Sequence, residues 1–197
     1  MGAAITVLIV LLIRRFLRYL KECRLHLFSK KGDENSSNDR KNTSKQKHSS
    51  LRQVMIDYLN DINFKFQLIP EENAIRFVIN GLHGDIDCQI KMNEEKHYFI
   101  LSSNLPVEFT DSKLYQVMET ILRLNEYLIF GNFNLSYECR SIYFSNTIMM
   151  SESQNKSLIE RSFSSHFGTL DDCIPLFKNV IDNNEEPLIT ILEVFKN

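Results

Sequence analysis

Residues 84–103 read GDIDCQIKMNEEKHYFILSS, and this stretch decides the fold. Its first half alternates polar and apolar residues, with the apolar positions at Ile86, Cys88, Ile90 and Met92. A period of two predicts a strand with one buried and one wet face. A turn signal at residues 93–96 and a second apolar segment at residues 98–103 follow. The stretch therefore predicts an antiparallel hairpin.

Similar patterns continue on both sides of this hairpin. Strand-like segments are expected at residues 64–68, 74–79, 132–137 and 141–147. Helical spacing is expected at residues 51–63, from a cap at Asp111 to Gly131, and at residues 159–181 with bends at Gly168 and Pro175. Residues 188–195 fit either a short strand or a helical turn. The order is helix, three or four strands, helix, two strands and long helix, which predicts an α+β fold with an antiparallel sheet flanked by helices.

The N-terminus has the composition of a membrane anchor. An apolar run of residues 3–13 is followed at once by arginines. The run is shorter than the roughly 20 residues that a bilayer core requires, so spanning needs the arginine side chains to snorkel to the headgroups. We expect a membrane helix within residues 1–28. The anchoring residues would be Ile5, Val7, Leu8, Ile9, Val10, Leu11, Leu12, Ile13, Arg14 and Arg15.

The order of charge and hydrophobicity orients this helix. Basic residues follow the apolar run, which is the reverse of a secretory signal peptide. Lys and Arg favour the cytoplasmic side, so a single-pass helix would place the N-terminus outside and the remaining chain in the cytoplasm. Two other interpretations stay open: an amphipathic helix lying at the membrane interface, and a soluble helix packed on the domain.

A polar linker separates the predicted anchor from the domain, and charge differs sharply across it. Residues 29–50 contain no apolar residue and are expected to be disordered. Residues 14–52 carry twelve Lys or Arg and four Asp or Glu, a net +8, whereas residues 53–197 carry eleven and twenty-one, a net −10. The basic part suits a polyanionic surface, membrane or nucleic acid, and its lysines could lie near anionic lipid headgroups. The acidic domain, residues 51–197, argues against nucleic acid as a partner.

No motif for catalysis, cofactor binding or metal binding stands out. The four cysteines are widely spaced and resemble small buried hydrophobes in a reducing compartment. The densest polar cluster is His83, Asp85 and Asp87, which could act as an acid–base or metal site but fits better as the solvated face of a half-buried strand. His166, within the long helical stripe, has no carboxylate near it in the sequence.

One resemblance to a known family follows from the second half of the chain. A Leu124-Asn125 pair near a helix end is followed by Gly131-Asn132-Phe133-Asn134-Leu135, then a hairpin and a long helix. This arrangement resembles the YbjN-like family, whose fold is shared with type III secretion chaperones, over about residues 50–182. The resemblance implies an α+β adaptor or chaperone that binds other proteins and has no catalytic residues. An N-terminal anchor is not a standard part of that family.

These observations lead to a membrane-anchored, non-enzymatic protein-interaction module on the cytoplasmic side. It would bind an extended segment of a partner at a sheet edge or in a hydrophobic groove. The alternative is a small-ligand sensor with an apolar pocket between sheet and helices, and a third hypothesis is an enzyme that uses the His83 cluster. A homodimer through the exposed sheet or the long helix is also compatible with the pattern.

Overall fold

The computed structural model describes residues 50–151 and 156–196, so the predicted anchor and nearly all of the linker lie outside the described residues. The described residues form an α+β domain with one six-stranded, wholly antiparallel sheet in the order β1-β2-β3-β4-β6-β5. The strands are β1 (Phe66–Ile69), β2 (Ala74–Gly81), β3 (Gly84–Asn93), β4 (Tyr98–Asn104), β5 (Asn132–Ser136) and β6 (Ser141–Met149). The helices are α2 (Leu51–Asp61), α3 (Leu114–Tyr127), α4 (Lys156–Asp182) and α5 (Pro187–Lys196), with short 3₁₀ turns η1 (Pro70–Glu72) and η2 (Asp111–Lys113).

The alternation of the opening stretch sets the register of the whole sheet. One row of paired residues crosses five strands: Phe77, Cys88, Ser103, Phe144 and Phe133. All five side chains are buried. Successive side chains of a strand point to opposite faces. The residues that alternate with these five along each strand therefore point to the other face of the sheet, which is open to solvent. The expected strand pattern, with one wet face, is confirmed.

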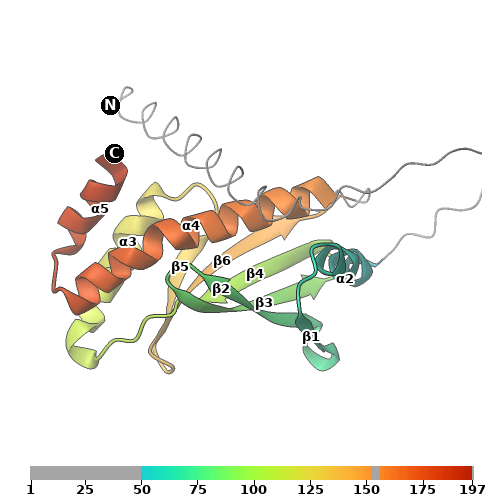
Figure 1. The fold of residues 1–197 in the computed structure, drawn as a ribbon, viewed down its shortest axis with the longest axis horizontal. Helices are drawn as coiled ribbons and strands as arrows, with labels where there is room; N and C mark the ends of the chain where they lie inside the picture. Colours follow the sequence, from blue (N-terminus) through green and yellow to red (C-terminus); the bar gives the residue numbers. More distant parts are fainter. Residues whose placement is uncertain (1–49, 152–155, 197) are drawn as a thin grey trace, which may run out of the picture.

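Helices cover one face of this sheet. Figure 1 shows α4 lying across the sheet, with α2 at one end of it and with α3 and α5 at the other end. Tyr58 of α2 meets Phe163 of α4 with ring centroids 5.2 Å apart. At the far end, α3 packs against β5, α4 and α5. The expected packing of an antiparallel sheet with helices on one face is confirmed.

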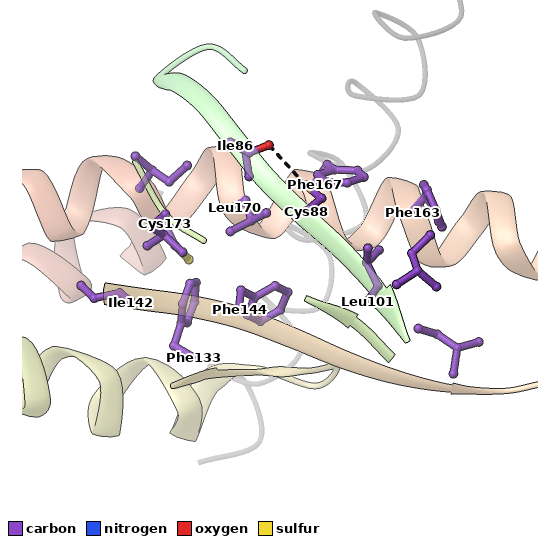
Figure 2. Packing of buried hydrophobic residues seen from close by; sticks show 14 of the residues in the cluster. Ile86, Cys88, Leu101, Phe133, Ile142, Phe144, Phe163, Phe167, Leu170 and Cys173 are labelled. Carbon is purple, nitrogen blue, oxygen red and sulfur yellow. Dashed lines mark hydrogen bonds between the residues drawn. The ribbon is translucent and has the colours of Figure 1, made fainter. Parts of the chain in front are cut away.

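The core between the two layers is filled mainly by aromatic and branched side chains. Figure 2 shows residues of α4 facing residues of the sheet; it labels Phe163, Phe167, Leu170 and Cys173 on the helix and Ile86, Cys88, Leu101, Phe133, Ile142 and Phe144 on the strands. The rings of Phe133 and Phe177 lie edge to face, 5.2 Å apart. Burying each such ring contributes about 1.5–3 kcal/mol, so this layer holds α4 in place.

Two expectations about α3 need correction. Asp111 does not cap a helix: it lies in η2, α3 begins at Leu114, and the Asp111 carboxylate pairs with Arg140. The helix does not reach Gly131 but ends at Tyr127, because Leu128 is already extended. Of the two alternatives left open for residues 188–195, the structure has the helical one: α5 begins at Pro187, a favoured position for proline. The helix α4 continues through both Gly168 and Pro175.

Candidate functional site

The polar cluster around His83 does not assemble into a site. Asp85 and Asp87 are exposed on the face of β3 that points away from the helices, and Asp85 accepts a hydrogen bond from Asn80 at 2.6 Å. His83 lies on the side of α4, where Lys178 donates to its carbonyl oxygen at 2.9 Å. Among the described residues, no group of three or more His, Cys, Asp or Glu side chains is placed to bind a metal ion.

His166 instead forms a polar network inside the core. Its Nδ1 lies 2.6 Å from Oδ1 of Asn146, and its Nε2 lies 2.8 Å from Oγ of Ser103. Oγ of Ser103 lies in turn 3.1 Å from Sγ of Cys88. The tautomer of the neutral ring sets which of its nitrogens donates, and the single hydroxyl proton of Ser103 can be given either to Nε2 of His166 or to Sγ of Cys88, not to both. The network thereby joins α4 to β3, β4 and β6.

The surroundings of this network keep it neutral. Burial lowers the pKa of His166 to about 3, and the ring has no solvent exposure. Burial also raises the pKa of the Cys88 thiol to about 12. A histidine paired with a serine can serve as a catalytic base, but that chemistry requires access to a substrate. The His166 network is buried away from solvent, and its hydrogen bonds hold α4 against the sheet.

The two edge strands of the sheet, β5 and β1, differ in whether a side chain already bonds their outward-facing backbone groups. At β5, the side chain of Asn125 from α3 bonds both backbone groups of Phe133: Oδ1 accepts from its N–H at 2.8 Å, and Nδ2 donates to its carbonyl at 3.0 Å. The Leu124-Asn125 pair thus has a physical role, since Leu124 is fully buried and Asn125 occupies the hydrogen-bonding groups of an edge strand. A partner strand cannot pair there without displacing Asn125.

The other edge, β1, has no such cover within the described part of the chain. Its four residues pair with β2 on one side, and β1 ends the sheet on the other side. Alternate residues of an edge strand direct their N–H and C=O groups outward, where they can pair with an added strand. Leu68 is 43% exposed and Phe66 is half-buried next to it. The β1 edge therefore offers backbone pairing together with apolar side chains.

A shallow hollow lies on the open face of the sheet and not between the sheet and the helices. Polar side chains dominate its lining, which consists of Arg76, Asp87, Cys88, Gln89, Ser102, Asn104 and Tyr143. The space between the layers, where an apolar ligand pocket was expected, is occupied at its centre by fully buried rings such as Phe99 and Phe144. The hollow suits polar contacts and does not match the expected apolar pocket.

The predicted anchor, from Ile5 to Arg15, lies outside the described residues. Among the helices of the described part, none has both the length and the apolar character needed to cross a bilayer.

Comparison with known proteins finds similarity at the level of structure. No protein-family model and no curated protein sequence matches the chain. A chain from the crystal structure of the ExsC–ExsE complex matches with a TM-score of 0.51 and 9% identity, over 64% of this chain and 92% of that chain. The structure of the HopA1–SchA chaperone–effector complex matches with a TM-score of 0.41 and 9% identity, over 60% and 88%. The structure of YbjN, a putative transcription regulator from E. coli, matches with a TM-score of 0.44 and 10% identity, over 64% and 94%.

At such low identity these matches concern the fold alone. The resemblance expected from the sequence is confirmed in that sense. The described domain shares the α+β fold found in the ExsC–ExsE complex.

Proposed function

We propose that this protein is a non-enzymatic protein-interaction module that binds an extended segment of a partner protein at the β1 edge. The observation that carries the proposal is the contrast between the two sheet edges. Asn125 closes β5, whereas β1 has no cover within the described residues and displays Leu68. The fold likeness supports it, because that fold occurs in a complex of two proteins, ExsC and ExsE.

Pairing at β1 would use two contributions. Backbone hydrogen bonds would give affinity for any extended segment, and alternate side chains of that segment would contact Phe66 and Leu68. A segment with apolar residues at every second position fits this surface best. The fold likeness to a chain of the ExsC–ExsE complex supports the non-enzymatic part of the proposal, and the buried His166–Ser103 pair gives no reason to propose catalysis there.

We further propose that residues 1–28 hold the module at the inner face of a membrane. The support is the apolar run with its trailing arginines. Fractionation with protease protection tests both insertion and orientation. The domain is expected in the membrane fraction and to be digested in inside-out vesicles only. Recovery in the soluble fraction, or protection in inside-out vesicles, would contradict this part.

Substitution at the β1 edge tests the binding surface. We expect Leu68→Lys to lose a stoichiometric partner that full-length protein retains through purification from detergent-solubilised membranes. Val78→Lys is the comparison variant, because Val78 is 59% exposed on the opposite face of β2, one residue beyond the pairing of β2 with β1. Equal loss with both variants, or retention with both, would refute binding at β1.

A further inference from the structure

The helix α3 carries an apolar surface that no described residue covers. Tyr115, Met118 and Leu122 are 77%, 45% and 67% exposed. Their spacing of three and four residues places them on one side of the helix, opposite the buried Val117 and Leu124. We call Tyr115, Met118 and Leu122 the α3 surface. Large apolar side chains gathered on one face of a helix mark an interaction site more often than scattered ones do.

An acidic row runs alongside the α3 surface. Glu119 and Glu126 follow Tyr115 and Leu122 by four residues each, so their carboxylates lie beside these side chains. Arg123 binds Glu119 at 2.7 Å, and this bond, together with the charges of Glu126 and of Glu186 beyond the end of α4, raises the pKa of the Arg123 guanidinium. Three carboxylates against one guanidinium leave a net charge of −2. The surface therefore fits a partner that is apolar on one side and basic on the flank.

A segment with this chemistry lies in the same chain. Residues 14–28, RRFLRYLKECRLHLF, contain five Lys or Arg and one Glu, a net +4. If this segment forms a helix, Phe16, Leu20, Cys23 and Leu27 fall on one side, because their spacings are four, three and four. Arg14, Arg18 and Lys21 fall on the other side and at its flanks. The apolar positions match the α3 surface and the basic ones match the acidic row.

The linker is long enough to allow this contact. Residues 29–50 number twenty-two, and an extended chain of that length spans up to about 70 Å. A folded domain of this size is only about 40 Å across. The segment can therefore reach any side of the domain. The length of the linker does not favour one surface over another, so the choice of surface depends on matching apolar side chains and opposite charges.

A second copy of the domain fits the α3 surface less well. It would bring a second pair of Glu119 and Glu126 to the seam, and like charges at close range oppose association. We propose that the α3 surface is the docking site for the chain's own basic segment, residues 14–28. The apolar run before Arg14 takes no part in this contact. Docking covers the α3 surface in the full chain. Because a membrane-spanning helix needs Arg14 and Arg15 at the headgroups, the docked arrangement and the membrane-spanning arrangement exclude each other.

A disulfide trap tests the proposal, because Cys23 lies on the apolar side of the segment. The full-length protein in a neutral detergent would carry Leu122→Cys and, to remove the exposed native thiol, Cys139→Ser. The matched control carries Val78→Cys in place of Leu122→Cys, since Val78 is also exposed but lies on the open face of the sheet. Brief oxidation with diamide is followed by mass spectrometry of the unreduced protein.

We expect an intramolecular disulfide between Cys23 and position 122 in about tenfold higher yield than between Cys23 and position 78, because docking raises the local concentration of one thiol only. The yield should fall when salt rises from about 0.1 to about 1 M, since salt screens the charge contacts. Equal yields at the two positions would overturn the proposal. A dominant disulfide between two copies at position 122 would assign the surface to a second copy and would also overturn it.

Discussion

Replacing His166 by glutamine should remove most of the acid sensitivity of the domain between about pH 7 and about pH 5. The ring is fully buried and is held neutral by Asn146 and Ser103. Glutamine keeps a polar end but cannot take up a proton. The variant therefore separates the cost of charging a buried group from the cost of losing the network.

The magnitude follows from the pKa of His166. Burial lowers that pKa from 6.5 to about 3, so the unfolded chain binds the proton more readily than the folded one. The stability contributed by the neutral ring is complete above about pH 6.5 and is lost as the pH falls toward about 3. At about pH 5 the loss is about 2 kcal/mol, since each unit of pKa difference is about 1.36 kcal/mol.

Urea unfolding of the full-length protein, followed by circular dichroism because the chain has no Trp, measures this effect. His166→Gln should cost about 1–3 kcal/mol at neutral pH through lost hydrogen bonds. Between neutral pH and about pH 5, the free energy of unfolding of the variant should fall by about 2 kcal/mol less than that of the native protein. His97→Asn is the matched control, since His97 is solvent-exposed and has a left-handed backbone that asparagine tolerates. Equal pH dependence of the native protein and His166→Gln would refute the reasoning.

Three further substitutions test the local structure by the same unfolding assay. Gly131→Ala should destabilise the domain by more than about 2 kcal/mol, because φ is +72° and a Cβ would lie 2.7 Å from Asn146 and Phe144; a loss near zero would contradict the packing. Asn125→Ala should cost about 2 kcal/mol and speed hydrogen exchange at β5, because both edge bonds are lost; unchanged exchange would contradict the closed edge. Glu94→Ala should cost about 1–2 kcal/mol, because its carboxylate accepts from the first two N–H groups of α2, both at 2.8 Å; an equal loss in Glu95→Ala would show that the cap is not responsible.

The sheet and the long helix could be predicted from the sequence because each has a simple periodicity. Alternation over residues 86–92 gave β3 and its wet face, and steps of three and four from Ile159 to Ile181 gave α4. The end of α3 could not be predicted from its apolar stripe. The chain leaves the helix at Leu128, which is extended, although the apolar stripe continues through that residue. The segment at residues 188–195 was ambiguous because Ile and Thr suit a strand, whereas packing against α3 and α4 makes it a helix.

The His166 network could not be predicted from the sequence, for a different reason. Asn146 and Ser103 lie 20 and 63 residues from His166 in the chain. Only the pairing of β4 with β6, together with the position of α4 above them, brings the three together. The contrast between the β1 and β5 edges could not be predicted either, because local periodicity does not determine the order of strands in a sheet. The Leu124-Asn125 pair could be recognised in the sequence. Its role, in which Asn125 bonds the backbone of the edge strand β5, follows only from the structure.

Partner contact at β1 is tested most directly by a photoreactive amino acid at position 68. The full-length protein carrying it would be irradiated in intact cells and purified under denaturing conditions. The account predicts a covalent adduct with a distinct partner protein from position 68, and little or none from position 78 on the open face of the neighbouring strand. No adduct from position 68, or the same adduct from both positions, would contradict the assignment of the β1 edge as the binding site.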